Sequence, residues 1–143
     1  MSCVFCDIVQ GRAPASVIYR DDTIVAFMGI RPIAPGECLV IPTAHIDHFT
    51  DLDDATSQRI IVLAQRLGRR LRSHFSPQRV GMVVHGYGVA HAHLILVPQH
   101  APDDITSGRF ARIENGRIVF SEDVLPFTDR TELDEQAQRL AED

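Results

Sequence analysis

The chain has 143 residues, of which 45% are apolar and 23% are charged. These values predict one globular domain spanning residues 1–143, with a core large enough to fold without disulfides. A net charge of −5 and 14 scattered basic residues offer no concentrated basic surface, so we expect no nucleic-acid polymer as a partner. The apolar runs are too short to cross a bilayer and no basic leader precedes a long apolar run, so we expect a cytoplasmic protein without membrane contact.

The first elements in chain order are a short helix and a hairpin. Residues 4–10 predict a helix that ends at Gly11. The run "VIYRDDTIVAFMGI", residues 17–30, predicts two short strands around the polar pair Asp21 and Asp22. The prolines and glycine of "RPIAPGE" then predict a rigid loop.

A buried strand and the main helix follow. The segment "CLVIP", residues 38–42, predicts a short buried strand with Cys38 in the core. Asp53 or Asp54 is placed to cap a helix. Apolar residues then recur at the three- and four-residue spacing of an amphipathic helix: Ile60, Leu63, Ala64, Leu67, Leu71 and Phe75.

The second half predicts two antiparallel strands, a hairpin and a final helix. Residues 79–84 and 89–98 read as strands joined by the short turn "HGYG". Asn115-Gly116 predicts a tight hairpin within a C-terminal hairpin and helix over 110–142. The fold class is therefore α+β, with an antiparallel sheet and two main helices on one face. One face of the final helix is apolar: Leu133, Ala137 and Leu140.

Two histidines in the predicted strand 89–98 are candidates for chemistry. Alternation along the strand sends His91, His93 and Ile95 to one face, while Ala92, Leu94 and Leu96 face the core. Hydrogen-bonded structural histidines are one interpretation of this pattern. Two imidazoles at positions i and i+2, beside other signals, favour a functional site.

The spacing Cys3-x-x-Cys6 is the first of those signals, because two thiolates on one turn can bind a metal ion from the same side. His45, just after the strand 38–42, and His91 would complete a Cys2His2 set. Two alternatives are a redox pair, which would need a βαβ context absent here, and cysteines that are simply packed. The odd count of 3 cysteines argues against a disulfide framework.

The segments "CVFCDIVQGRAPASVIYRDDTIVAFMGIRPIAPGECLVIPTAHIDHFTDL" and "HAHLILVPQ" resemble the histidine triad (HIT) family in order, spacing and the closing proline. The tail "TDRTELDEQAQRL" is similar to the C-terminal helix of bacterial members. The resemblance implies the HIT fold, with a five-stranded antiparallel sheet that joins edge to edge in a homodimer. It also implies a structural zinc ion, held in bacterial members by the residues that match Cys3, Cys6, His45 and His91.

The resemblance further implies that His93, the middle member of the H-x-H-x-H motif, is a nucleophile with His91 beside it. His93 would attack an α-phosphorus of a nucleotide-like ligand, expel an amine or phosphate, and leave a nucleotidyl-histidine that water hydrolyses. A neutral imidazole suits this role when a backbone carbonyl holds its other nitrogen and fixes the tautomer.

Several residues depart from the family pattern where substrate is held. Ile95 takes the third motif position, where an oriented donor is usual; losing one such donor typically costs roughly 2.7 to 4 kcal/mol. Gly29 takes the place of an aspartate that holds ribose hydroxyls in many members. The loop before the motif is shortened to "HGYG", so His85 and Tyr87 are expected to fill part of its space, followed by Gly88 and Val89 as further substrate contacts.

Three functions are consistent with these residues. The first is a divergent HIT-type nucleotide hydrolase or transferase, in which His85 or His100 assists His93. The second is a scaffold that binds or transforms a different small molecule, with His93 as acid or base. The third is a zinc-stabilised dimeric binding protein without turnover.

Overall fold

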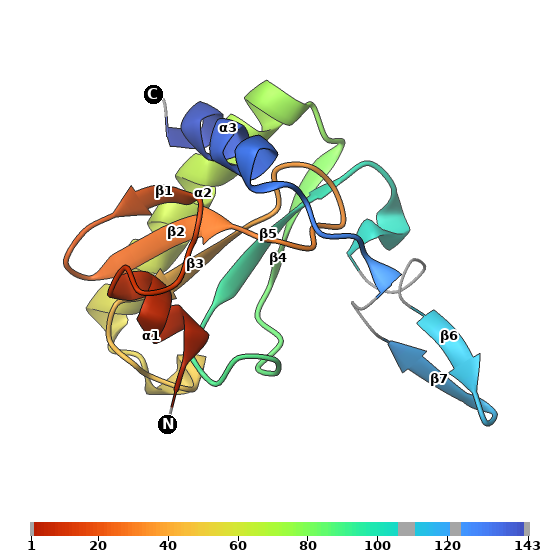
Figure 1. The fold of residues 1–143 in the computed structure, drawn as a ribbon, viewed down its shortest axis with the longest axis horizontal. Coiled ribbons are helices and arrows are strands. Elements are labelled where there is room, and N and C mark those ends of the chain that lie inside the picture. Colours follow the sequence, from red (N-terminus) through yellow and green to blue (C-terminus); the bar gives the residue numbers. More distant parts are fainter. Residues whose placement is uncertain (1, 106–110, 121–123, 142–143) are drawn as a thin grey trace.

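A computed structural model describes residues 2–105, 111–120 and 124–141 (Figure 1). Its centre is a five-stranded antiparallel sheet in the order β1-β2-β3-β5-β4. This arrangement confirms the predicted α+β class and the antiparallel pairing of β4 with β5. The strands are β1 Val17–Arg20, β2 Ile24–Met28, β3 Cys38–Pro42, β4 Arg79–Val83 and β5 Leu94–Gln99.

Helices cover both faces of this sheet. The two long helices, α2 (Asp54–Phe75) and α3 (Arg130–Ala141), pack against one face, and α1 (Val4–Val9) lies on the other (Figure 1). The prediction that the two main helices cover one face is therefore confirmed for α2 and α3, and α1 covers the other face. Because both faces are covered, every residue of β2 is buried.

The two core clusters follow the alternation of the strands. On the α2 side, Leu67 and Leu133 of the long helices pack with Val40 and Leu96 of the sheet. On the α1 side the apolar cluster is smaller, and its buried members are Phe5, Ile8, Val25, Phe27 and Ile41. Cys38 belongs to the larger cluster, as predicted, and burial raises the pKa of its thiol above the usual range.

Helix α2 begins at the capping residue that the sequence indicated. The side chain of Asp53 accepts a hydrogen bond of 2.8 Å from the Thr56 backbone N–H, so Asp53 rather than Asp54 is the N-cap. That bond holds the pKa of Asp53 below its usual value. Among the described helices, none combines the length and apolar character needed to span a bilayer.

The segment before β5 differs from its prediction. The strand expected over 89–98 begins only at Leu94, so the two histidines precede it. The reason is that one local and one long-range hydrogen bond divert the backbone. The His91 N–H donates to the Val89 carbonyl at 2.8 Å, and the Ala92 N–H donates to the carbonyl of Ile46, which is distant in sequence, at 2.7 Å. The prediction of a short turn at "HGYG" is likewise wrong, because an irregular segment, residues 84–93, joins β4 to β5.

The predicted C-terminal hairpin is confirmed as a separate two-stranded sheet, β6 (Ala111–Glu114) with β7 (Arg117–Phe120). Asn115 and Gly116 have φ of 49° and 73°, which the type I′ turn of a two-residue hairpin requires. In Figure 1 the hairpin extends away from the main sheet. Positions 110 and 142 of the predicted hairpin-and-helix region lie outside the described residues, as do 121–123.

The loop between β2 and β3 is fixed where it meets the helices. Gly36 has φ +99° and its backbone N–H donates to Oε1 of buried Gln136, on α3, at 3.1 Å. A Cβ at Gly36 would lie 2.7 Å from a Leu71 methyl carbon of α2. The close approach of loop and helix therefore requires glycine.

We expect Gly36→Ala to destabilise the protein more than the matched change Gly11→Ala. Both glycines have positive φ, +99° and +71°, so alanine at either costs about 1–2 kcal/mol. Of the two, only Gly36 has side-chain atoms in the way of the added methyl, including a ring carbon of half-buried Phe75 at 3.2 Å, which adds about 1–3 kcal/mol. Urea unfolding measures both changes, and equal losses would contradict this packing.

Candidate metal centre and active site

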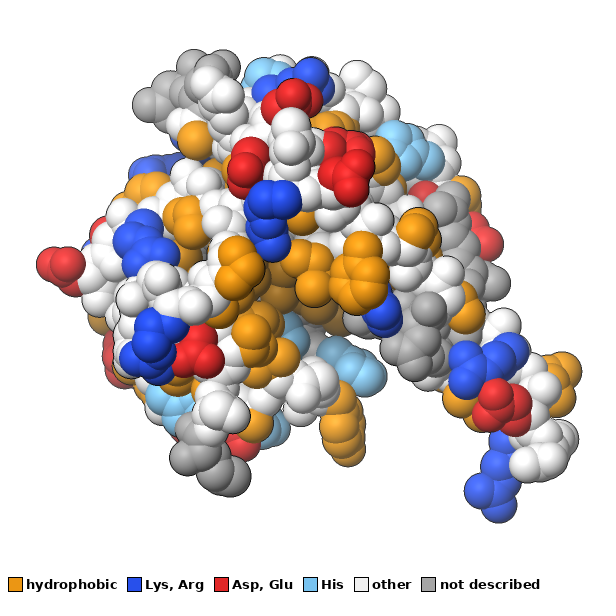
Figure 2. All heavy atoms as spheres, in the orientation of Figure 1, with side chains coloured by type: hydrophobic (Ala, Val, Ile, Leu, Met, Phe, Trp, Pro, Cys, Tyr) orange, Lys and Arg blue, Asp and Glu red, His pale blue; other side chains and the backbone are white. Residues whose placement is uncertain are grey.

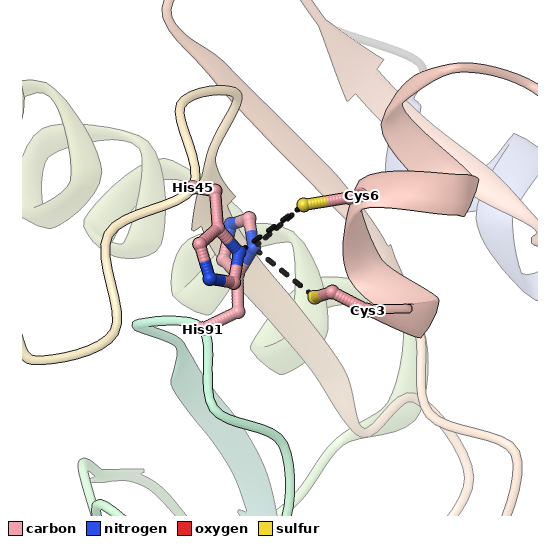
Figure 3. A group of neighbouring side chains, drawn as sticks. All are labelled: Cys3, Cys6, His45 and His91. Atoms are coloured by element: carbon pink, nitrogen blue, oxygen red, sulfur yellow. Dashed lines mark hydrogen bonds between the residues drawn. The ribbon is translucent and has the colours of Figure 1, made fainter. Parts of the chain in front are cut away.

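Four side chains from three separate segments meet beside α1 (Figure 3). Cys3 and Cys6 stand one turn apart at the start of α1, His45 follows β3, and His91 precedes β5. Their ligand atoms all lie within 4.8 Å of one another. The structure therefore brings together the four residues predicted as metal ligands.

The separations suit one tetrahedral metal ion. Sγ of Cys6 lies 3.2 Å from Nδ1 of His45, and the Cys3 and Cys6 sulfur atoms each lie 3.6 Å from Nδ1 of His91. Tetrahedral zinc with ordinary bond lengths sets its sulfur and nitrogen ligands about 3.5 Å apart. Two thiols and two imidazoles are also the donor set of closed zinc sites, so these residues fit such an ion.

His91 is oriented toward the two sulfur atoms by a second hydrogen bond. Its ring is fully buried, and Nε2 donates to the Pro42 carbonyl at 2.8 Å, which leaves Nδ1 unprotonated. Burial lowers the pKa of His91, which keeps the ring neutral as metal binding requires. Burial, with the neighbouring Cys3 thiol, raises the pKa of Cys6, and a bound cation would favour its ionised form.

His93 is held in one tautomer by the backbone of His91. Nδ1 of the half-buried His93 lies 2.7 Å from the His91 carbonyl oxygen, which can only accept, so Nδ1 carries the proton. Nε2 then has a free lone pair. The edge of the Phe5 ring packs against the His93 ring at a centroid distance of 5.3 Å, which fixes its orientation.

A cavity of about 250 Å³, here called the His93 cavity, lies beside this imidazole. Its walls include His48 and His85, together with Val89 and the two motif histidines. Of the predicted loop residues, His85 and Val89 thus reach the site, while Tyr87 and Gly88 do not line this cavity. Tyr87 is 77% exposed and touches the site only through His85, whose ring centroid lies 5.4 Å away.

A separate cavity of about 460 Å³, the Ile95 cavity, brings together Ile95 and Gly29. Leu39, the cross-strand partner of Ile95, joins them in its apolar lining. Its lining also includes Phe127, whose ring lies 4.0 Å below the guanidinium of Arg31. Figure 2 shows hydrophobic side chains gathered in the central hollow of the face opposite α2.

Sequence reasoning missed some lining residues and misplaced one. The repeat of histidine in "HIDH" is a signal for His48, three residues after His45. Arg31 and Phe127 gave no local signal, because tertiary packing brings together two residues that are 96 positions apart in the chain. His100, considered as an assistant to His93, follows the opposite end of β5 and lines neither cavity.

The HIT domain family matches residues 10–101, so the chain belongs to this family. An uncharacterised HIT-like protein of Mycoplasma genitalium is 34% identical over 104 residues, which are 69% of this chain and 74% of the relative. A zinc-bound histidine triad family protein from Mycobacterium smegmatis is 28% identical, with a TM-score of 0.75 over 99% of this chain and 91% of that chain. A HIT family hydrolase from Legionella pneumophila Philadelphia 1 is 34% identical, with a TM-score of 0.56 over 67% of this chain and 91% of that chain.

These similarities confirm the HIT fold that the sequence motifs implied. The zinc-bound relative and the Cys3, Cys6, His45 and His91 cluster together suggest zinc binding. The family includes hydrolases, as the Legionella protein illustrates.

Proposed function

We propose that the protein is a HIT-type hydrolase or transferase that acts at the α-phosphate of a nucleotide-like small molecule, with His93 as nucleophile. One observation carries this proposal. The bond of 2.7 Å between Nδ1 of His93 and the His91 carbonyl reserves Nε2 for the substrate, at the wall of a cavity of about 250 Å³.

The proposed reaction has two displacement steps at phosphorus. Nε2 of His93 attacks, a phosphorus–nitrogen bond forms, and the bond to the leaving amine or phosphate breaks. The proton stays on Nδ1, and its hydrogen bond to the His91 carbonyl stabilises the positive ring. Protonated His85, across the His93 cavity, gives its proton to a leaving amine. Water then attacks phosphorus, breaks the bond to His93 and returns the lost proton to His85.

A zinc ion with Cys3, Cys6, His45 and His91 as ligands would have no open position and would supply structural rather than catalytic chemistry. Its place supports this role, because the four residues tie α1 to the loop after β3 and to segment 84–93. His91 is the link to catalysis: its ring joins the cluster while its carbonyl orients His93.

A homodimer that pairs its sheets edge to edge is part of this proposal. Strand β4 is an edge of the sheet and exposes Met82, followed by exposed Val84, while α2 exposes Ile61 nearby. A second copy paired at β4 would satisfy the edge strand's unpaired backbone N–H and C=O groups and cover these apolar side chains.

The protein is proposed to act in the cytoplasm.

The Ile95 cavity supports a second candidate function, in which His93 acts on a small molecule that is not a nucleotide. Leu39, Ile95 and Phe127 give the cavity an apolar wall. The carboxylate that also lines it, Glu37, accepts a hydrogen bond of 2.6 Å from the Ile33 backbone N–H. A ligand with an apolar portion of similar size would suit it better. A binding protein without turnover is less favoured, because it gives no role to the oriented Nε2 of His93.

His93→Ala is expected to abolish release of AMP from adenosine 5′-phosphoramidate, by at least about a thousandfold, because no covalent intermediate can form. Trapping of a nucleotidyl-histidine on the wild-type protein under alkaline denaturing conditions, where the phosphorus–nitrogen bond survives, measures the same step. His100→Ala is the matched control, since His100 lies beyond the far end of β5. Unchanged turnover in His93→Ala would remove it as nucleophile.

Cys3→Ser and His45→Ala are expected to lose zinc and to lower the unfolding temperature, because metal binding contributes directly to folding. Zinc per protein is measured by mass spectrometry, and unfolding by calorimetry with and without a chelator. Cys38→Ala is the control, since Cys38 is buried in the α2-side core and lies outside the cluster. Metal-free wild-type protein would contradict the site.

The double change Gly29→Asp with Ile95→His is expected to raise kcat/KM for adenosine 5′-phosphoramidate by about a hundredfold or more, because it restores an oriented donor and a ribose-binding carboxylate. A Cβ at Gly29 makes only ordinary contacts, the nearest at 3.5 Å to the Glu37 carbonyl. Gly29→Ala with Ile95→His adds the same Cβ without the carboxylate. No gain in either variant would favour a substrate other than a nucleotide.

A further inference from the structure

The wall of the His93 cavity contains a third imidazole, that of His48, which has no task in the proposed reaction. His48 lies in the loop after β3, whereas His85 and His93 lie in segment 84–93, which joins β4 to β5. Two separate parts of the chain thus present imidazoles to the same small space of about 250 Å³. A phosphate group that His93 attacks must enter this space.

The loop that carries His48 is fixed beside the site. The ring of His45 belongs to the four-residue cluster. The carbonyl of Ile46 accepts a hydrogen bond of 2.7 Å from the N–H of Ala92, the residue between the two motif histidines. The carbonyl of His48 itself accepts from the Asp51 N–H at 3.0 Å. The backbone of His48 is therefore positioned relative to the motif.

Two contacts hold the His48 side chain, although it is exposed. Its ring stacks on that of Phe49, with 5.5 Å between centroids and 24° between planes, and Nδ1 lies 2.8 Å from Oγ1 of Thr50. His48 lines the cavity and Thr50 does not, so Nδ1 bonds on the side away from the cavity and Nε2 is the nitrogen left for a ligand. Donors contribute most to catalysis when they are held in place before the substrate arrives.

The Thr50 hydroxyl allows Nε2 of His48 to act as a donor. A hydroxyl donates as well as accepts, and when Oγ1 donates to Nδ1 the ring proton lies on Nε2. The carbonyl partner of His93 has the opposite effect, since it only accepts and so places the proton on Nδ1. The two rings therefore suit different tasks, with His93 as nucleophile and His48 as donor.

A donor at this place meets an electrostatic need of the proposed reaction. Asp47 also lines the His93 cavity, and its carboxylate opposes the entry of a phosphate. Ile95, at the third motif position, lines a different cavity and has no donor. Catalysis of phosphoryl transfer depends mainly on positioning and on donors or cations that stabilise charge on the phosphoryl oxygens.

We propose that His48 is a catalytic residue that binds the transferred phosphoryl group: its Nε2–H donates to a non-bridging oxygen, a task that Ile95 cannot perform. This inference rests on the proposed function. As Nε2 of His93 bonds to phosphorus and the bond to the leaving group breaks, the hydrogen bond from His48 strengthens and its proton stays on His48. The same hydrogen bond serves when water attacks the nucleotidyl-histidine.

The test compares two AMP compounds: adenosine 5′-phosphoramidate, whose amine leaves with a proton, and AMP p-nitrophenyl ester, whose phenolate leaves without one. His48→Phe keeps a ring on Phe49 and removes the donor, so kcat/KM should fall about a hundredfold for both compounds. His85→Ala should lower kcat/KM far more for the phosphoramidate than for the ester. A loss in His48→Phe that is confined to the phosphoramidate would overturn the proposal, by making His48 a proton donor to the leaving group.

Conservative variants distinguish a donor from a structural ring. His48→Gln retains an N–H donor and should recover part of the loss, and Thr50→Ser should keep the kcat/KM that Thr50→Val loses. His74→Phe is the matched control, because His74 is an exposed histidine in the last turn of α2 and lies outside the lining of the His93 cavity. Wild-type kcat/KM in His48→Phe would overturn the proposal.

AMP binding to the His93→Ala protein, measured by calorimetry, separates this inference from the proposed function. Adding His48→Phe should weaken AMP binding about tenfold or more and leave adenosine binding unchanged, because adenosine has no phosphate. That pattern would support His48 as a phosphate ligand even if neither compound turned over. Equal AMP affinity with and without His48→Phe would overturn this inference alone, and a protein that neither binds AMP nor turns over either compound would overturn both.

Discussion

The organisation of the site depends on the two hydrogen-bonding ends of one buried residue, His91. Its ring donates to the Pro42 carbonyl and turns Nδ1 toward Cys3 and Cys6, while its own carbonyl accepts from Nδ1 of His93. A shift of this residue would therefore change the cysteine and histidine cluster and the His93 tautomer together. His91 therefore orients both the cluster and His93, because a hydrogen bond fixes a side chain most strongly where it is buried away from water.

The two faces of the sheet have different roles around that residue. The α2 face carries the larger core and holds loop 29–37 through Gly36 and Gln136. The α1 face carries a smaller apolar cluster, the four-residue cluster and the Ile95 cavity. His93 lies just outside the strand ladder, because the chain enters β5 only at Leu94.

Ile95 and Gly29 lie apart from the residues that hold His93. Neither residue belongs to the cluster of Cys3, Cys6, His45 and His91. Both line one cavity with Leu39 and Phe127, and the bond between Nδ1 of His93 and the His91 carbonyl does not involve them. Substitutions at these two positions are therefore expected to change what the cavity holds without turning His93.

Much of the fold could be predicted from local pattern. The Asp53 cap, the 3.6-residue period of α2 and the Asn115-Gly116 turn are set by neighbouring residues, and each was found where the sequence placed it. The start of β5 could not be predicted, because the amide of Ala92 bonds to Ile46, a contact distant in sequence. The periodicity of two alone favoured a longer strand.

The sequence by itself determined the family, the class of fold and the residue types of the cluster, because motif order and spacing carry that information. Only the tertiary structure decided that His93 lines a cavity while its Nδ1 bonds to the His91 carbonyl, and that Phe127 and Arg31 meet beside Ile95. These are properties of space between elements. Such space depends on how segments far apart in the chain pack together, which no local period records.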